Sequence, residues 1–216
     1  KCRDDQFPLE DFESAGYEVA HFGLNQWNGV GIASRLPLED IEQGFPGMPG
    51  FTKNPEEEPA TEARAISATV DGLRLCSVYV PNGRALDDPH LDYKLRWLEA
   101  LGEHYRSYQD QPGALPVAIG GDFNVAPLDS DVGDPAFLVQ GTTHTSDLER
   151  TTLQDFLHRA GLQDTVRPLV PTGYTYWDYK QGKFPKDHGM RIDFIFGSES
   201  FASQVTHASI ERDQRQ

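Results

Sequence analysis

The residues best suited to chemistry follow a short apolar run at 115–120. The segment Gly-Gly-Asp-Phe-Asn at 120–124 begins with two glycines, which let the backbone turn sharply or let a ligand approach closely. If the strand continues, Asp122 and Asn124 point to the same face. A carboxylate beside a carboxamide can hold a hard cation, orient a water or bind phosphate oxygens. The alternative is a turn in which both side chains bond their own backbone, and spacing alone favours neither.

Tyr79 and Asp193 are two further candidates, each at or inside a predicted strand. Tyr79 opens the segment Tyr-Val-Pro-Asn-Gly-Arg at 79–84, where a strand ends and its hydroxyl could be aimed at a phosphate. An aromatic that packs on the core is the alternative, and the segment alone favours it. Asp193 interrupts the apolar run at 190–197, where a carboxylate is costly without a partner. It therefore pairs with a cation or a histidine, or faces solvent at a strand end.

Two segments between 174 and 191 could contact a phosphate chain. Residues 180–191 carry four basic residues against Asp187, a net charge of 4 − 1 = +3, in the clearest basic run of the chain. This run is either a phosphate-binding patch or a solvated loop. Residues 174–179 read Tyr-Thr-Tyr-Trp-Asp-Tyr. Aromatics at this density either fill a core or stack on a nucleic-acid strand, and the sequence leaves both readings open.

The composition excludes several function classes. The net charge of the 216 residues is 19 − 34 = −15, which argues against a general nucleic-acid coat protein but not against an enzyme with a local cationic patch. No apolar run reaches the roughly 18 residues of a membrane helix, and the two cysteines predict no disulfide framework. The seven histidines show no zinc-site spacing. The glycine motifs of serine hydrolases, P-loop kinases and Rossmann dehydrogenases are absent.

The elements that must position these residues alternate between hairpins and helices. Asp71-Gly72 predicts a tight hairpin between two β-rich runs, and Asp88-Pro89 predicts the start of a helix. Proline and acidic residues predict a solvated loop over 36–63. A second helix is expected over 149–160, and strands are expected over 17–22, 29–34, 64–70, 73–80, 115–120, 174–179, 190–197 and 204–210. This mixed order predicts a single domain, an α/β sandwich with mixed sheets.

Five segments taken in order resemble the exonuclease III family of apurinic/apyrimidinic (AP) endonucleases. This family lies in the endonuclease/exonuclease/phosphatase superfamily, which includes DNase I, and the Trp-Asp-Tyr form of the fourth segment resembles bacterial members. The resemblance implies an α/β fold, a four-layer α-β-β-α sandwich with two mixed β-sheets and an active site at one end. The segments are Trp-Asn-Gly-Val-Gly-Ile-Ala-Ser at 27–34, Val-Tyr-Val-Pro-Asn-Gly at 78–83, Gly-Asp-Phe-Asn-Val-Ala-Pro at 121–127, 174–179, and Arg-Ile-Asp-Phe at 191–194.

The resemblance also implies roles for individual residues. Asp122 matches the aspartate that orients or deprotonates the attacking water, and Asn124 matches the partner that stabilises the transition-state phosphate. Both are implied ligands of Mg²⁺, with Mn²⁺ as the alternative ion. Tyr79 matches the tyrosine near the scissile phosphate, and Asp193 matches the aspartate that pairs with a catalytic histidine. The implied DNA-contacting residues are Asn82, Arg84 and Trp177.

The expected function is Mg²⁺-dependent hydrolysis of DNA phosphodiesters, as a 3′–5′ exodeoxyribonuclease and AP endonuclease of base excision repair. The expected partner is duplex DNA with abasic sites or 3′ ends, and the expected protein is a cytoplasmic monomer that does not engage a membrane. One alternative is another phosphoesterase of the superfamily, an inositol phosphate phosphatase or a sphingomyelinase. A non-catalytic DNA-binding relative is the other.

The chain also departs from the family pattern at both ends. Lys1 resembles the lysine of a Gln-Glu-Thr-Lys motif whose glutamate is the main metal ligand, and that glutamate would precede Lys1. The family also has an asparagine on its first strand and a closing Ser-Asp-His motif, and neither is found in 1–216. We therefore expect a single domain truncated at both ends, without the N-terminal strand and helix and without the C-terminal strand. Such a piece should be weakly active or inactive, and poorly stable.

Overall fold

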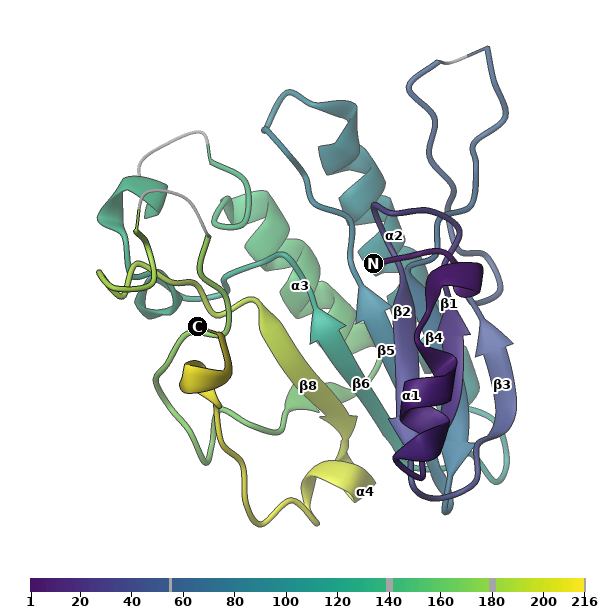
Figure 1. Cartoon of the computed structure of the whole chain (residues 1–216). Coiled ribbons are helices and arrows are strands. Elements are labelled where there is room, and N and C mark those ends of the chain that lie inside the picture. Colours follow the sequence, from purple (N-terminus) through teal and green to yellow (C-terminus); the bar gives the residue numbers. More distant parts are fainter. Residues whose placement is uncertain (55, 139–141, 179–181, 216) are drawn as a thin grey trace.

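The computed structural model describes residues 1–54, 56–138, 142–178 and 182–215, and its strands form two sheets (Figure 1). The larger sheet has six strands in the order β3-β4-β5-β6-β8-β7. It is mixed, because β5 and β6 run parallel while its other neighbours are antiparallel. The strands are β3 (Glu39–Gln43), β4 (Ala65–Val70), β5 (Leu73–Tyr79), β6 (Val117–Asp122), β7 (Leu162–Asp164) and β8 (Asp193–Ser198).

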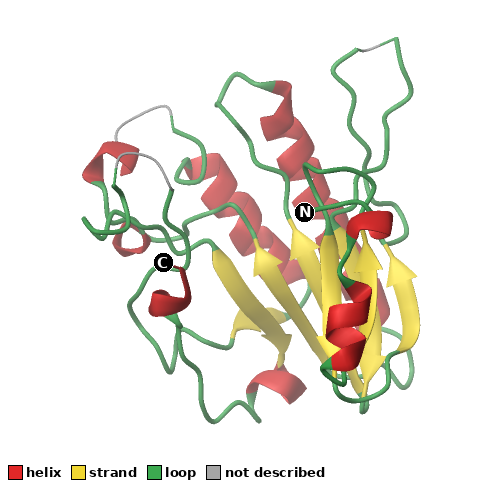
Figure 2. Cartoon of the chain, in the orientation of Figure 1, coloured by secondary structure: helices red, strands yellow, loops and turns green. Residues whose placement is uncertain are grey.

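The second sheet is an antiparallel pair, β1 (Glu18–Phe22) with β2 (Val30–Ser34). Helices α2 (Pro89–Gln109) and α3 (Asp147–Arg159) cover one face of the larger sheet, and the β1–β2 pair covers β4 and part of β5 on the other face (Figures 1 and 2). Helix α1 (Leu9–Ser14) packs outside β1. The chain is therefore layered α-β-β-α, as expected.

Shorter helical segments complete the described structure. They are α4 (Glu199–Ala202) and the 3₁₀ turns η1 (Asp4–Gln6), η2 (Asp129–Asp131), η3 (Pro135–Leu138) and η4 (Arg212–Arg215). Among the described residues, none of these helices combines the length and apolar character needed to cross a bilayer.

Local sequence signals set several of these boundaries. Asp71 and Gly72 both have positive φ (47° and 76°), the turn that a two-residue hairpin needs, so the predicted β4–β5 hairpin is confirmed. The Asp88 carboxylate accepts the backbone N–H of His90 at the start of α2, as predicted. Helix α3 begins two residues before the predicted start, because Ser146 and Glu149 form a capping box.

The main core lies between the helices and the larger sheet. Trp97, Leu98 and Leu101 of α2 pack on Ile119 of β6 and Phe196 of β8, and each of these side chains is at most 1% exposed. The helical spacing of the α2 residues is what turns one apolar face onto the sheet. This packing and the antiparallel pairing of β6 with β8 fix the ends of the two strands side by side.

A smaller core lies between the two sheets and ends before β8. Phe22 and Val30 of the β1–β2 pair meet Ile66 and Ala68 of β4, all buried. On β8, Ile195 is 44% exposed. The face of the larger sheet at β8 is thus more open to solvent than the face at β4.

Three predictions of local structure were wrong. Residues 36–63 were expected to be loop, but they contain β3, which pairs with β4 from Glu39 to Gln43. Its residues are mostly charged and exposed, because it is an edge strand and charged side chains there oppose pairing with other chains. An apolar alternation was therefore missing from this strand.

Two expected strands do not form. Within the described part of 174–179, Tyr176 makes only an isolated bridge with Met190, and neighbouring aromatic rings pack on one another. The last residue of that prediction, Tyr179, lies outside the described residues. Residues 204–210, all of which the structure describes, contain no strand.

Gly121 is the glycine on which the sheet most depends. It has φ +147°, and a Cβ atom built on it would lie 1.9 Å from the carbonyl oxygen of Val78 on β5. We expect Gly121→Ala to lower the free energy of unfolding by about 3 kcal/mol, because the backbone clash adds to the conformational strain. Urea denaturation followed by circular dichroism measures this loss. Gly72→Ala is the matched control, since Gly72 has φ +76° but nothing within 4 Å of the added atom.

The clash is tested by the difference between these two variants. Gly72→Ala should lose only the strain cost of a positive φ, about 1 kcal/mol. Equal losses for both variants would show that the close approach of β5 and β6 at Gly121 contributes nothing.

Candidate active site

Three of the predicted catalytic residues form one row across the larger sheet. Tyr79, the last residue of β5, pairs in register with Asp122, the last residue of β6. Asp122 in turn pairs with Asp193, the first residue of β8. Directly paired residues on neighbouring strands point to the same face. The structure therefore brings a phenol and two carboxylates side by side at one edge of the sheet, from positions far apart in the sequence.

Two cations adjoin Tyr79. The Nζ atom of Lys1 donates a 2.7 Å hydrogen bond to the Tyr79 hydroxyl. The Arg64 guanidinium lies 5.0 Å from the centre of the Tyr79 ring and donates to the Tyr79 carbonyl oxygen at 3.1 Å. Arg64 is also paired with Glu62, whereas Lys1 is exposed. Lys1 is therefore the cation that an anion entering beside Tyr79 would meet.

Asp122 is perturbed in the direction expected of a catalytic base. Burial, and then the nearby Asp193 carboxylate, raise the pKa of Asp122 to about 7, although the Asn124 N–H and the cations Lys1 and Lys94 act in the opposite direction. A carboxylic acid with a pKa near neutrality can both accept and return a proton at physiological pH. A strongly perturbed group at the edge of a sheet is a candidate for function.

Asn124 does not continue the strand, which corrects the expectation that Asp122 and Asn124 share an extended face. Strand β6 ends at Asp122, and Asn124 has φ 53°. Its backbone N–H donates to Asp122 Oδ1 at 2.8 Å, so the turn interpretation is correct for the Asp122 side chain but not for that of Asn124. The Asn124 side chain is nonetheless placed in the site, because its Nδ2 donates to the carbonyl oxygen of Val80 at 2.9 Å and fixes the amide.

Asn82 and His144 complete a polar cluster around Asn124. The Asn124 Oδ1 atom accepts from Asn82 Nδ2 at 3.2 Å and lies 3.1 Å from His144 Nε2. Since Asn124 Nδ2 is committed to Val80, the His144 Nε2–H is the donor in the second contact. Burial, and then Lys94, lower the pKa of His144 to about 4, so the ring is neutral at pH 7. The cluster is therefore an uncharged hydrogen-bonding group beside an acidic one.

His144 is the site residue that the sequence analysis missed. It lies in a loop, and its spacing matches no metal-site or catalytic motif. The capping box of Ser146 and Glu149 was a readable signal, because it marks the start of α3 and so places the residues just before it at a helix N-terminus. Glu149 also accepts the backbone N–H of His144 at 2.9 Å.

The predicted DNA-contacting residues lie in different surroundings. Asn82 joins the polar cluster, and its Oδ1 accepts the backbone N–H of Arg84 at 2.8 Å. Arg84 itself is exposed. Trp177 is only 6% exposed, and its Nε1 donates to Asp187 at 3.3 Å. Arg84 is therefore open to a partner, while most of the Trp177 ring packs within its own loop against Tyr174 and Phe184.

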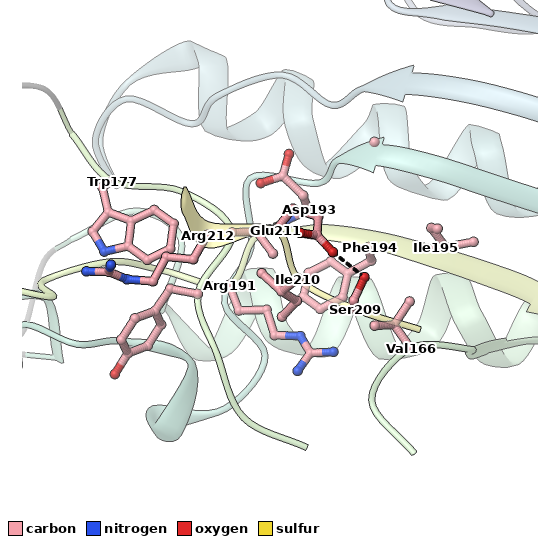
Figure 3. A pocket seen from close by; sticks show the side chains of 13 residues that line it. Val166, Trp177, Arg191, Asp193, Phe194, Ile195, Ser209, Ile210, Glu211 and Arg212 are labelled. Carbon is pink, nitrogen blue, oxygen red and sulfur yellow. Dashed lines mark hydrogen bonds between the residues drawn. The ribbon is translucent and has the colours of Figure 1, made fainter. Parts of the chain in front are cut away.

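A cavity of about 340 Å³ adjoins the row of catalytic candidates. Figure 3 shows Asp193 on one side of it and the Trp177 ring and Arg212 on another. Arg191 also lines the cavity, although its side chain is 1% exposed. Trp177 and Asp193 thus share one hollow, which links the predicted DNA-contacting aromatic to the predicted catalytic carboxylate.

The basic run at 180–191 is smaller as a surface patch than its sequence suggests. Lys183 is bound to Asp134, and Arg191 is buried with its Nη1 donating to the carbonyl oxygen of Val170. Lys180 lies outside the described residues. The structure therefore uses Lys183 and Arg191 for internal contacts.

Comparison with known proteins adds a family to this geometry. A model described as the Endonuclease/Exonuclease/phosphatase family matches residues 1–215. A curated protein from Bacillus subtilis (strain 168), named exodeoxyribonuclease, is 30% identical over 185 residues, which make up 80% of this chain and 71% of that protein.

Two solved structures share the fold at recognisable sequence identity. The 3′ phosphatase NExo from Neisseria, bound to a product DNA hairpin, superposes with a TM-score of 0.81 and 36% identity over 94% of this chain and 75% of that one. An AP endonuclease from Archaeoglobus fulgidus superposes with a TM-score of 0.82 and 30% identity over 98% of this chain and 79% of that one.

Proposed function

The chain belongs to the Endonuclease/Exonuclease/phosphatase family, and we propose that it carries the hydrolytic centre of a DNA repair nuclease, with 3′–5′ exodeoxyribonuclease and AP endonuclease activity. The observation that carries this proposal is the row of Tyr79, Asp122 and Asp193 at one edge of the sheet. Asn82, Asn124 and His144 lie beside it. These are the groups that hydrolysis of a phosphodiester requires: a base, hydrogen-bond donors and acidic ligands for a cation.

Asp122 is the proposed base. A phosphodiester repels anionic nucleophiles, so the attacking water must be oriented and must lose a proton as it attacks. With a pKa of about 7, the Asp122 carboxylate is largely able to take that proton at pH 7.5, and its Oδ1 is held by the Asn124 N–H. General-base catalysis of this kind typically contributes about 10²- to 10⁴-fold.

The hydrogen-bonding groups around Asp122 are proposed to stabilise the phosphate. The Tyr79 hydroxyl and the second N–H of the Asn82 amide provide donors, while the His144 Nε2–H is given to Asn124 Oδ1 and orients the Asn124 amide. Donors fixed before the reaction stabilise charge that develops on the phosphate oxygens without the cost of reorienting. Lys1 and Arg84 add positive charge at the rim of the site in a chain whose net charge is −15.

Members of this family depend on a divalent metal, and the acidic pair fits one. Asp193 raises the pKa of Asp122, which shows that the two half-buried carboxylates repel each other. A cation bound between them would reduce this repulsion. Within the described residues, no group of three or more His, Cys, Asp or Glu side chains converges as a metal site. We propose that Asp122 and Asn124, with the Asp193 carboxylate nearby, supply oxygen ligands to Mg²⁺, or Mn²⁺, which would neutralise phosphate charge.

Removal of the metal provides the first test of this function. We expect Mg²⁺ to support, and EDTA to abolish, cleavage of a duplex oligonucleotide that carries one abasic site or a 3′-recessed end. The assay is denaturing gel electrophoresis of the labelled strand. Cleavage that persists unchanged in EDTA would contradict the metal-dependent function.

The same experiment distinguishes substrate classes. The similar proteins described above include an exodeoxyribonuclease, a 3′ phosphatase and an AP endonuclease, so internal abasic sites and 3′ ends are compared at equal concentration. Inositol phosphates and sphingomyelin are the non-DNA competitors. Turnover of either at a rate above that of DNA would move the proposal to another phosphoesterase, and tight DNA binding without turnover would indicate a binding protein.

We further propose that the protein acts as a monomer in the cytoplasm. Sedimentation velocity of the purified protein at micromolar concentration tests the first point. Cell fractionation with an antibody against the chain tests the second.

A further inference from the structure

An ion pair is completely buried behind the candidate active site. Lys94 of α2 and Glu149 of α3 are bonded through Nζ and Oε1, and both side chains are 0% exposed. A buried pair of this kind often adds little stability compared with apolar side chains of similar volume, because removing two charges from water is costly. Its presence between two helices therefore calls for a reason other than packing.

The remaining hydrogen bonds of this pair run to the loops of the site. Lys94 Nζ donates to the backbone carbonyl oxygen of Asn124 at 2.6 Å. Glu149 Oε1 accepts the backbone N–H of His144 at 2.9 Å and the hydroxyl of Thr143 at 2.8 Å. The ion pair thus holds the main chain of the two residues whose side chains meet at 3.1 Å in the site.

Both of the held residues have a backbone conformation that needs support. Asn124 has φ 53° and His144 has φ 79°, and a non-glycine residue in this region costs on the order of 1 kcal/mol or more. Such strain persists only where the surrounding structure enforces it. The loops are also tied directly, since the Ala126 N–H donates to the His144 carbonyl oxygen at 2.8 Å.

We propose that Lys94 and Glu149 are positioning residues of the phosphoester site, which hold the Asn124 amide and the His144 imidazole in contact and aligned for the substrate phosphate. This role rests on the proposed function, and it assigns the pair no contact with substrate. The link runs from Lys94 to the Asn124 carbonyl and from Glu149 to the His144 N–H. Loss of either link would let a strained residue relax away from the other.

The variant that tests the proposal is Lys94→Met/Glu149→Leu, which replaces the pair with apolar side chains of similar size. We expect the folded variant to lose roughly tenfold to a hundredfold in kcat on the DNA substrate, because small misplacements of reacting groups cost that much. KM should change by less than about threefold, since Lys1 and Arg84, the cations proposed to attract the phosphate, are not substituted. A fall in stability with an unchanged kcat would overturn the proposal.

A matched control exists on the same two helices. Glu103 of α2 and Arg159 of α3 also form an ion pair, at 2.9 Å, but their side chains are 49% and 39% exposed. Glu103→Gln/Arg159→Met removes an α2–α3 ion pair without touching the site loops. We expect this double variant to keep the kcat of the parent, and a loss equal to that of Lys94→Met/Glu149→Leu would overturn the proposal.

A measurement without turnover separates this proposal from the proposed function. In ¹⁵N-labelled protein, the His144 ring and Asn124 amide signals report the contact directly, assigned with His144→Gln and Asn124→Asp. We expect both signals to shift or broaden in Lys94→Met/Glu149→Leu and to stay in place in the control. Unchanged signals would overturn the proposal. If the parent protein hydrolyses none of the substrates, the function fails while this test still decides the positioning role.

A milder variant covers the case in which the double variant does not fold. Glu149→Gln keeps an oxygen that accepts the His144 N–H but removes the charge that pairs with Lys94. We expect smaller shifts of the same two signals and an intermediate kcat. Shifts of both signals and a kcat below that of the parent and of Glu103→Gln/Arg159→Met would support the link, and signals and a kcat equal to those of the parent would overturn it.

Discussion

Replacing Asp122 with asparagine is expected to lower the rate of DNA hydrolysis by about 10²- to 10⁴-fold while making the folded protein more stable above pH 7. The loss of rate follows from removing the proposed base. The gain in stability follows from its environment, because burial and the Asp193 carboxylate disfavour the ionised form of Asp122. Asparagine is neutral, and its Oδ1 can still accept the Asn124 N–H.

The pH dependence of this gain follows from the direction of the shift. Below about pH 4 the Asp122 carboxyl is protonated in both folded and unfolded chains, so it contributes no difference. Between pH 4 and its folded pKa of about 7, the folded state increasingly carries a penalty that the unfolded state does not. The penalty is complete above pH 7, where its upper limit is about 4 kcal/mol at about 1.4 kcal/mol per pKa unit.

Urea denaturation without metal, at pH 4.5 and pH 8.5, measures this effect. The difference in unfolding free energy between Asp122→Asn and the parent should be small at the lower pH and reach on the order of 2 kcal/mol at the higher pH. Asp92→Asn is the control, since Asp92 is a 72% exposed carboxylate on α2. If Asp122→Asn gains no more unfolding free energy at pH 8.5 than Asp92→Asn does, burial and repulsion by Asp193 do not destabilise the ionised form of Asp122.

Removal of the Glu149 carboxylate alone is expected to cost about 3–5 kcal/mol of unfolding free energy. In Glu149→Leu, Lys94 is left in an apolar interior without its counter-charge, and the Thr143, His144 and Ser146 donors lose their acceptor. In Lys94→Met/Glu149→Leu, the charge is removed together with its partner. The Thr143, His144 and Ser146 donors lose their acceptor in the double variant too, so it should be less stable than the parent but at least about 2 kcal/mol more stable than Glu149→Leu.

Acid also tests this pair. Burial alone would raise the pKa of Glu149, but the Lys94 ammonium and the surrounding hydrogen bonds lower it to about 2. The stability that the ionised carboxylate contributes is present above about pH 4.5 and is lost as the pH falls towards 2. The difference in unfolding free energy between the parent and Glu149→Leu, measured by urea titration, should become smaller as the pH falls over this range. A difference in unfolding free energy that stays constant from pH 6 to pH 2.5 would show that the ionised Glu149 carboxylate does not stabilise the folded protein.

The three catalytic candidates could be predicted from the sequence because each lies at the end or the start of a strand, and the residues next to it in the sequence show where that strand lies. The apolar run before Gly120 and the hairpin at Asp71-Gly72 placed Asp122 and Tyr79 at strand ends. Their register, Tyr79 to Asp122 to Asp193, required the strand order of the sheet. That order depends on the parallel crossover through α2, which local patterns do not encode.

What escaped the sequence analysis are contacts between distant loops. Strand β3 was not predicted because an edge strand needs no apolar alternation. It forms because it pairs with β4, which the local sequence does not show. His144 and Lys94 escaped because a single polar residue in a loop or on a helix shows no pattern until its partner is known. The strand expected at 174–179 does not form over the described residues 174–178, because Trp177 packs on Tyr174 and on Phe184 instead.

The pairing of Tyr79, Asp122 and Asp193 also determines at which stage of synthesis these three side chains can come together. Parallel and long-range strand pairings form late in folding, because distant segments must first be brought together. On the ribosome, β5 and β6 emerge before β8, so a nascent chain that has not yet exposed Asp193 lacks one of the two paired carboxylates. The pair of carboxylates therefore forms only once β8 has emerged and paired with β6.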